Sequence, residues 1–193
     1  WQMQFDLLAI RNETFVRSLI YREELESTNS TLTELVAEES LESPALVLAN
    51  LQTAGRGRGG NEWHSSAGSL TFSVLLEFPM LPIERLASFS LTVGLAVCQS
   101  IESFAPTSET TIKWPNDVYL DGKKLAGVLV ERPWASEPSL VVGIGVNLNN
   151  DLAQAPREIR NSAVSMVETL GGRICPNQFL IECLQQLERR SKD

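Results

Sequence analysis

Glycine and arginine alternate in one short segment of this chain, Gly55-Arg56-Gly57-Arg58-Gly59-Gly60, and Trp63 follows three residues later. Glycine has no Cβ, so the backbone N–H groups of such a segment can turn towards an anion. Arginine adds a fixed positive charge and a planar fork of donors that suits carboxylate and phosphate groups. The segment therefore predicts a local anion or nucleotide site, and the alternative is a flexible connector.

The glycine spacing also satisfies the GxGxxG pattern of dinucleotide-binding folds, at Gly55, Gly57 and Gly60. Such a fold needs a helix that begins at the loop and an acidic residue about twenty positions further on. Here residues 65–68 and a further strand follow instead, so a dinucleotide fold is not expected. The P-loop pattern fails too, because neither Lys-Ser nor Lys-Thr follows the glycines.

A second group of polar residues lies between Lys113 and Asp117. Pro115 interrupts strand pairing, so Asn116 and Asp117 are presented at a bend. Lys124 stands just before a very apolar run, where a charged side chain is uncommon. This group is a candidate polar site, and the alternative is an ordinary Asn-Asp turn with solvated lysines nearby.

A third group consists of Gly143 and Gly145, which interrupt the apolar run from Leu140 to Leu148. Glycine weakens a strand unless another group must approach its backbone closely. The pair therefore predicts such an approach. The strand could also be a sheet edge that pairs two copies into a homodimer, and the sequence leaves this open.

Hydrophobic periodicity indicates which elements position these groups. A helical period predicts helices over Thr31–Glu39, Pro82–Phe104, Ser165–Leu170 and Asn177–Arg189, the first capped from among Ser27, Thr28 and Asn29. Apolar runs and alternation predict strands over Ala45–Asn50, Gly68–Glu77, Thr111–Leu120, Lys124–Glu131 and Leu140–Leu148. Asp121-Gly122 is a turn signal that joins two of these strands into a hairpin. Hairpin-linked strands with helices between some of them predict an α+β fold with a mixed β-sheet.

Composition bounds the class of protein. The 193 residues, 43% of them hydrophobic, predict one packed domain over residues 1–193. A net charge of −8 opposes broad binding to nucleic acid or to anionic membranes. Three cysteines without a CxxC spacing predict buried thiols in a reducing, cytoplasmic compartment, and the single histidine, His64, makes a multi-histidine metal site impossible. No apolar run is expected to span a bilayer.

Five segments, in this order, resemble the catalytic domain of biotin protein ligases, the biotin–[acetyl-CoA-carboxylase] ligases. They are Glu26–Asn29, Gln52–Gly60 with Trp63, Lys113–Asp117, Lys124–Gly127 and Gly143–Asn147. Each segment alone is weak, but together they span most of the chain and are highly specific. The resemblance implies a fold similar to that of class II aminoacyl-tRNA synthetases, with helices packed on one side of a mixed sheet.

The resemblance also implies a two-step ligase reaction that forms a carbon–nitrogen bond. Biotin and ATP, with Mg²⁺, would form biotinyl-5′-AMP and pyrophosphate. A lysine of a biotin carboxyl carrier protein, as in acetyl-CoA carboxylase, would then attack the mixed anhydride and become biotinylated.

The matching motifs imply a role for each residue. For biotin, they imply contacts from Ser27, Thr28, Asn29, Gln52, Gly55, Arg56, Gly57, Lys124, Gly127, Gly143 and Gly145. For ATP or the adenylate, they imply contacts from Arg56, Arg58, Trp63, Lys113, Asn116, Lys124 and Asn147. Trp63 would exclude water from the anhydride, and the alternative is that it anchors the loop.

Four of these residues are expected to be catalytic. Arg56 and Arg58 would hold the carboxylate and the phosphates, and Lys124 would neutralise the charge that builds between them during adenylation. Asp117 would orient or deprotonate the incoming lysine, whose ordinary pKa of about 10.4 makes it a poor nucleophile while protonated.

The chain departs from the family pattern at Gly59, where many relatives carry a further arginine, which leaves one cation fewer for the adenylate. Neither the SH3-like β-barrel that usually follows this domain nor the N-terminal winged helix of repressor-type members is expected, and DNA is not expected as a partner. Two alternatives stay open. One is a lipoate or octanoyl ligase or transferase of the same superfamily, and the other is a non-catalytic biotin-binding module.

Overall fold

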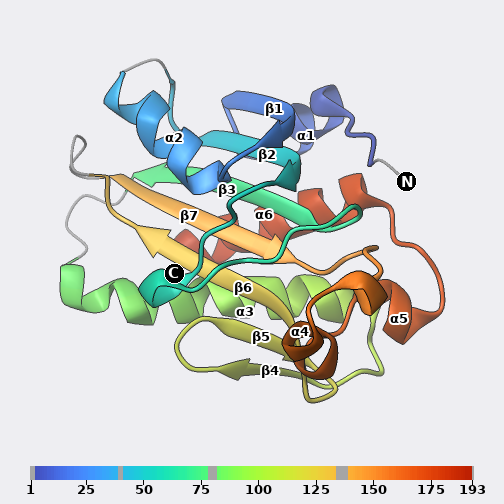
Figure 1. Ribbon diagram of the computed structural model, residues 1–193. Coiled ribbons are helices and arrows are strands. Elements are labelled where there is room, and N and C mark those ends of the chain that lie inside the picture. Colours follow the sequence, from blue (N-terminus) through green and yellow to red (C-terminus); the bar gives the residue numbers. More distant parts are fainter. Residues whose placement is uncertain (1–2, 39–40, 78–81, 134–138, 193) are drawn as a thin grey trace.

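The computed structural model describes residues 3–38, 41–77, 82–133 and 139–192. Within these ranges, one seven-stranded sheet has the strand order β1-β2-β3-β7-β6-β5-β4 (Figure 1). β1 and β2 are parallel, and every other neighbouring pair is antiparallel, which confirms the predicted mixed sheet. The strands are β1 (Ser18–Leu25), β2 (Ala45–Gln52), β3 (Leu70–Glu77), β4 (Thr110–Lys113), β5 (Asp117–Leu120), β6 (Lys123–Glu131) and β7 (Ser139–Val146).

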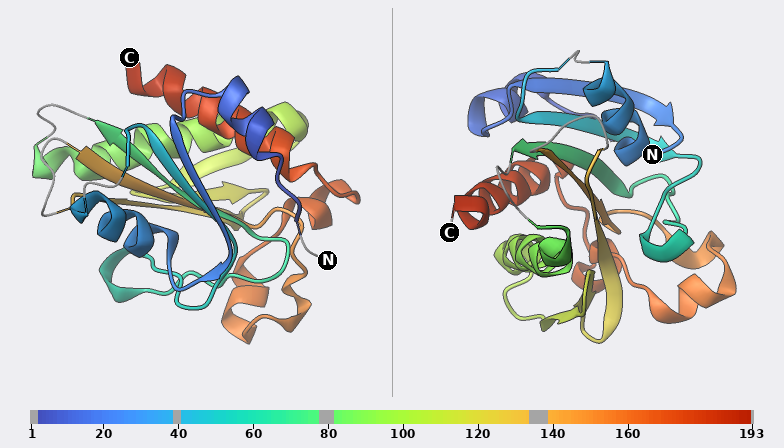
Figure 2. Two further views of the ribbon diagram at one scale, coloured as in Figure 1. Left: turned by 90° about the horizontal axis from the view of Figure 1, so that it is seen from above. Right: turned by 90° about the vertical axis from the view of Figure 1, so that its left-hand side faces the viewer.

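Helices lie on both faces of this sheet. They are α1 (Leu7–Glu13), α2 (Thr28–Ala37), α3 (Leu86–Phe104), α4 (Arg157–Ser162), α5 (Met166–Leu170) and α6 (Pro176–Lys192). α3 and α6 lie on one face, while α2 lies on the opposite face (Figure 2). On the α2 side, Leu32 forms a small second core with Val47 and Val141. The resemblance implies helices on one side of the sheet only. α3 and α6 agree with this, but α2 packs on the opposite face, so the strands beneath α2 are buried on both faces.

α3 is the longest of the described helices. Its apolar stripe of Phe89, Val93, Val97 and Ile101 is buried, as the helical period predicts. Contrary to the expectation from sequence, the 19 residues of α3, with a mean hydropathy of 1.2, are long and apolar enough to cross a membrane. Half of this apolar stretch is buried against the sheet and α6, so α3 packs as a core helix.

The predicted boundary of α2 differs from the structure at its first turn. The helix begins at Thr28 rather than Thr31, because the Ser27 side chain accepts the backbone N–H of Ser30 at 3.5 Å and caps the helix. The predicted end at Glu39 lies outside the described residues. The earlier start brings Thr28 and Asn29 into the first turn of the helix, where they face the sheet.

Other differences have local causes. The segment Thr111–Leu120 forms two strands, β4 and β5, because the turn that contains Pro115 separates them, which confirms the interruption predicted at Pro115. No periodic pattern predicts α1, β1 or α4. β1 is partly exposed along its length, so its sequence lacks the alternation that marks a half-buried strand.

β7 is an interior strand, which corrects the suggestion that it is an edge for dimerisation. It is hydrogen-bonded to β3 on one side and to β6 on the other, and its eight residues are all buried. An interior strand has no unpaired backbone groups to offer a second copy. Gly143 and Gly145 therefore need a different explanation, which the site supplies.

The three cysteines are free. Cys98 and Cys183 are buried as expected, whereas Cys175 is exposed, which corrects the expectation of three buried thiols. Burial raises the pKa of the Cys183 thiol to about 12, so this side chain stays protonated and packs as a small apolar group.

Candidate active site

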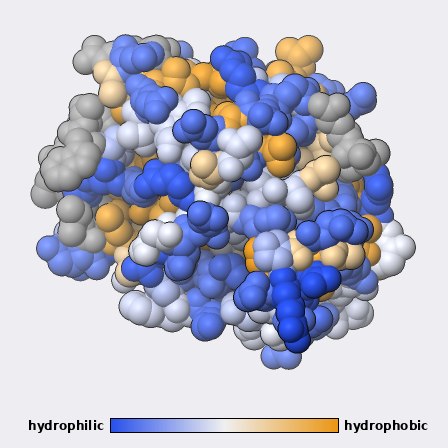
Figure 3. Space-filling view, in the orientation of Figure 1, coloured by the Kyte–Doolittle hydropathy of each residue, from blue (hydrophilic) through white to orange (hydrophobic). Residues whose placement is uncertain are grey.

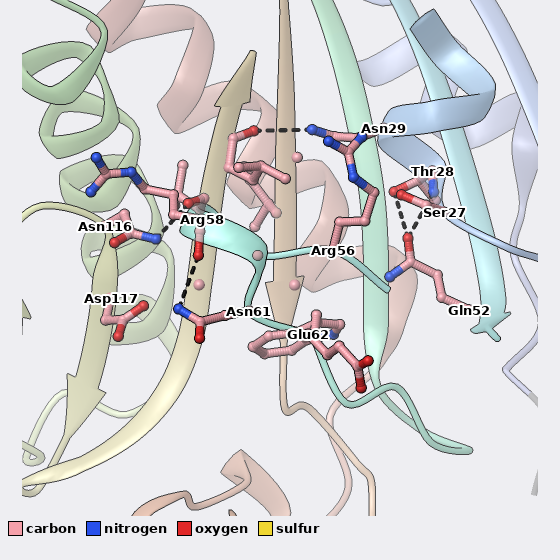
Figure 4. Close-up of a pocket in the computed structure, with 18 of the residues that line it drawn as sticks. Ser27, Thr28, Asn29, Gln52, Arg56, Arg58, Asn61, Glu62, Asn116 and Asp117 are labelled. Carbon is pink, nitrogen blue, oxygen red and sulfur yellow. Dashed lines mark hydrogen bonds between the residues drawn. The ribbon is translucent and has the colours of Figure 1, made fainter. Parts of the chain in front are cut away.

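A pocket lies on the α2 face of the sheet, beneath the glycine–arginine loop, Gly55–Trp63 (Figure 4). Its walls come from the first turn of α2, the end of β2, the loop itself and the strands β5, β6 and β7. The residues that line it are Ser27, Thr28, Asn29, Gln52, Arg56, Gly57, Arg58, Asn61, Glu62, Trp63, Asn116, Asp117, Lys124, Gly127, Val128, Leu129, Gly143, Ile144 and Gly145. All five motif segments, which lie far apart in the sequence, contribute at least two residues each to this one hollow.

The glycine–arginine loop folds back on itself over the pocket. The backbone N–H of Trp63 donates to the carbonyl oxygen of Gly55 at 2.8 Å, and that of Gly57 donates to Asn61 at 2.7 Å. A short 3₁₀ turn closes the loop between these bonds, with a φ of 63° at Gly59. Side chains disfavour this left-handed conformation, so the glycine at position 59 suits the turn that the loop makes.

The indole of Trp63 lies on a flat patch made by two glycines. Gly127 of β6 and Gly145 of β7 are directly opposed in the sheet register. A Cβ at position 145 would lie 2.8 Å from the Trp63 indole nitrogen, which is closer than a side chain can approach. The strand glycines therefore do allow a close approach, as predicted, and in this structure the approaching group is a side chain of the loop.

The Trp63 indole nitrogen is buried and has no hydrogen-bond partner among the described residues. A buried donor without an acceptor is costly, and most such groups in proteins are paired. Because Trp63 lines the pocket, a bound molecule with an acceptor at this point would satisfy the N–H group. The two sequence interpretations of Trp63, a loop anchor and a ligand contact, are thus compatible.

A chain of buried polar side chains forms one end of the pocket. The backbone N–H of Thr28 donates to Gln52 Oε1 at 2.7 Å, and the Thr28 hydroxyl lies 2.9 Å from the same oxygen. Ser73 lies 2.7 Å from the Thr28 hydroxyl and donates to Asn29 Oδ1 at 2.6 Å. The Cγ of Asn29 would be 2.9 Å from a Cβ at position 143, so Gly143 leaves room for the Asn29 amide.

Lys124 and Asp117 form an ion pair at the other end of the pocket. Lys124 Nζ lies 2.7 Å from Asp117 Oδ1, and both side chains are partly exposed. The β5–β6 hairpin brings them together through a turn in which Asp121 has a φ of 49° and Gly122 a φ of 79°, as the Asp-Gly signal predicts. The ion pair orients the Lys124 ammonium, so Asp117 has a positioning contact besides the role predicted for it.

Three residues of the predicted site lie outside this pocket. Gly55 holds the base of the loop and lines a second hollow on its outer side. Lys113 is exposed, with its Nζ 5.9 Å from the centre of the Tyr119 ring. Asn147 is buried beyond the end of β7, where its side chain accepts from Asn150 Nδ2 at 3.1 Å.

Four polar residues of the site region have no counterpart in the sequence prediction: Asn61 and Glu62, which line the pocket, and Ser73 and Glu131. Ser73 lies in a strand that is buried on both faces. A polar residue in such a strand is uncommon, and this could have identified Ser73 as a candidate site residue from the sequence. Glu131 ends the apolar β6 strand, where Arg56 Nη2 approaches its carboxylate to 2.5 Å. A charged residue at a strand end carries no such signal, because these positions are commonly solvated.

The charges of the pocket suit an anionic small molecule. Arg56, Arg58 and Lys124 supply three cations against the two carboxylates of Glu62 and Asp117, although the chain as a whole carries a net charge of −8. The opposite end offers neutral donors and acceptors from Thr28 and Gln52. On the outer surface of this side, hydrophilic and hydrophobic residues are interspersed (Figure 3). The arrangement can hold a polar, uncharged group at one end and neutralise carboxylate or phosphate at the other.

Fold and site together define a class of protein, an α+β protein with a polar, cation-lined pocket between a mixed sheet and a glycine–arginine loop. Residues 21–149 match the Biotin/lipoate A/B protein ligase family, and the chain belongs to that family.

Individual relatives include ligases that act on biotin. The chain is 34% identical to the bifunctional ligase/repressor BirA of Bacillus subtilis (strain 168), over 96% of this chain and 57% of that protein. It is 35% identical to the biotin--[acetyl-CoA-carboxylase] ligase of Mycobacterium tuberculosis, over 85% of this chain and 60% of that protein. This chain thus spans less than two thirds of the length of either relative.

A solved structure gives a similar comparison. The biotin protein ligase from Aquifex aeolicus in complex with biotin and ATP matches with a TM-score of 0.78 and 34% sequence identity. The match covers 91% of this chain and 71% of that chain.

Proposed function

We propose that this chain is the catalytic domain of a biotin protein ligase, formed by residues 1–193. It would convert biotin and ATP into biotinyl-5′-AMP and then transfer biotin to a lysine of a biotin carboxyl carrier protein. The observation that carries the proposal is the Lys124–Asp117 pair at the cationic end of a pocket whose other end is the Thr28–Gln52 pair. The relatives that bear this name support it.

In the first step, a carboxylate oxygen of biotin attacks the α-phosphorus of ATP. A bond forms between that oxygen and phosphorus, the α–β phosphoanhydride bond breaks, and pyrophosphate leaves. Lys124 neutralises the carboxylate and the α-phosphate together, while Arg56 and Arg58 hold the remaining negative charge. The neutral end of the pocket, at Thr28 and Gln52, takes the ureido ring of biotin.

Mg²⁺ is proposed to arrive with the triphosphate. Within the described ranges, no group of three or more His, Cys, Asp or Glu side chains is placed to hold a metal ion. Mg²⁺ is commonly bound through substrate phosphates and one or two carboxylates, so a preformed protein cage is not required. The three free cysteines are compatible with the reducing cytoplasm, which we propose as the site of action.

Mass spectrometry of the products tests this function directly. The protein is incubated with biotin and MgATP, and biotinyl-5′-AMP is expected in an amount that requires both substrates. Parallel incubations with lipoate and with octanoate are expected to give no adenylate. An adenylate from lipoate alone would replace the proposal with the lipoate ligase alternative. Biotin binding without any adenylate would favour a non-catalytic biotin-binding module.

Asp117→Asn is expected to slow the transfer step from preformed biotinyl-5′-AMP by about 10²–10³-fold, the range typical of a lost general base. The substituted amide cannot accept the proton of the carrier lysine, and it also loses the charge that orients Lys124. Transfer is measured as biotin incorporated into a purified carrier domain supplied with the adenylate.

Asp121→Asn is the matched control for this measurement. Asp121 lies on the same hairpin but is exposed at its turn, and asparagine tolerates the positive φ of that position. This variant is expected to transfer within about twofold of the unsubstituted protein, as surface substitutions usually do. Unchanged transfer by Asp117→Asn would remove Asp117 from the second step.

A further inference from the structure

Glu131 bridges the glycine–arginine loop and the buried floor of the site with its two carboxylate oxygens. Oε1 lies 2.5 Å from Nη2 of Arg56, and Oε2 accepts from Nδ2 of Asn29 at 2.9 Å. Glu131 is not among the residues that line the pocket. Its carboxylate therefore reaches the site only through the side chains that it holds.

The Asn29 end of this bridge is rigid. Asn29 is only 3% exposed, its Oδ1 accepts from Ser73, and its amide fills the space that the missing side chain of Gly143 leaves. Its Nδ2 donates to the carbonyl oxygen of Leu129 as well as to Glu131. The orientation of the Glu131 carboxylate is thus set by buried, close-packed groups.

The Arg56 end of the bridge is much more exposed. The Arg56 side chain is 47% exposed. Its second contact is a 3.3 Å hydrogen bond from Nη1 to Ser30 Oγ. A long side chain with this freedom loses conformational entropy when it binds an anion. A carboxylate that already fixes the guanidinium plane reduces that loss, since part of the ordering has occurred before the ligand binds.

We propose that Glu131 is a positioning residue that holds the Arg56 guanidinium, and with it the glycine–arginine loop, in place for the anionic group of the substrate. This inference rests on the proposed function for the identity of the substrate. The bridge itself joins side chains of this chain alone, so it can be tested without any turnover.

The first experiment uses trypsin on the ligand-free protein. Glu131→Gln is expected to raise the rate of cleavage after Arg56 and Arg58 by about fivefold, because local opening of the loop exposes these bonds. Cleavage after Lys123, the exposed first residue of β6, serves as the internal reference and is expected to stay the same. Glu77→Gln, at the exposed end of β3, is the matched control variant and is expected to leave both rates unchanged.

The second experiment measures adenylate formation at varied biotin concentration. Glu131→Gln is expected to raise the KM for biotin by about tenfold and to change kcat by less than about threefold, since it weakens binding without altering a group that contacts the reacting atoms. In an Arg56→Gln background, the same substitution is expected to have no further effect on KM. Such non-additivity is the signature of a residue that acts through its neighbour.

Ser30→Ala is a second variant, which tests the proposal even if Glu131→Gln does not fold. It removes the weaker partner of Arg56, and it is expected to shift trypsin cleavage and KM in the same direction by a smaller factor. Unchanged loop cleavage in both variants would overturn the proposal, and so would a lower kcat with an unchanged KM. Absence of adenylate from the unsubstituted protein would instead overturn the proposed function, while the trypsin experiment would still decide the role of Glu131.

Discussion

Lys124→Ala is expected to lower the rate of biotinyl-5′-AMP formation by about 10²–10³-fold, the loss typical when one electrostatic stabiliser of a transition state is removed. Lys124 Nζ is held 2.7 Å from Asp117, in the pocket that Arg56 and Arg58 also line. When the biotin carboxylate meets the α-phosphate, two anions come within bonding distance, and the ammonium group offsets their repulsion. Pyrophosphate release, followed with biotin and MgATP in excess, measures this step.

Lys123→Ala is the matched control, because it removes the same charge one residue earlier in β6, where the side chain is exposed. This variant is expected to form adenylate at a rate within about twofold of the unsubstituted protein. Lys124→Ala should also leave transfer from preformed adenylate much less affected than adenylation, since the α-phosphate is then already esterified. Equal rates of adenylation in the two variants would exclude Lys124 from the first step.

Gly145→Ala is expected to weaken retention of the adenylate by about 100-fold, equivalent to about 2.7 kcal/mol. The new Cβ would overlap the Trp63 indole, and the neighbouring backbone is an interior strand that is fixed on both sides. The indole must therefore leave the flat patch over Gly127 and Gly145, and it carries the rest of the loop away from the pocket. Dissociation of labelled biotinyl-5′-AMP, measured by rapid filtration, gives the change in retention.

Gly172→Ala is the control for glycine replacement, because a Cβ at that exposed position meets no atom within 4 Å. The double variant Trp63→Ala with Gly145→Ala separates packing from steric overlap. If the overlap with Trp63 causes the loss, the double variant should retain the adenylate no more weakly than Trp63→Ala alone. A double variant much weaker than Trp63→Ala would show that Gly145 has a direct role of its own.

The interpretation of Asp117 changes most when sequence and structure are compared. The sequence predicts a carboxylate at a bend, and Asp117 directly follows the turn that contains Pro115, as the first residue of β5. The structure adds that the same carboxylate is paired with Lys124 across the β5–β6 hairpin. One residue can thus orient the lysine of the first step and assist the incoming lysine of the second, which is why its substitution is tested on preformed adenylate.

Features with local causes followed from the sequence. The Asp121-Gly122 hairpin, the cap at Ser27 and the apolar stripe of α3 each depend on residues within a few positions of one another, so short-range patterns contain them. The motif residues also identified the chemistry of the pocket, because residue type alone decides which side chains carry charge or donate hydrogen bonds.

Only the tertiary structure decided how those groups meet. The interior position of β7, the contact of Trp63 with Gly145 and the bridge from Asn29 through Glu131 to Arg56 join residues that are far apart in the chain. Such contacts depend on strand order and register, which follow from the packing of the whole core rather than from local periodicity. The sequence by itself determined which groups could do the chemistry, and the packing of the sheet determined which of them stand together.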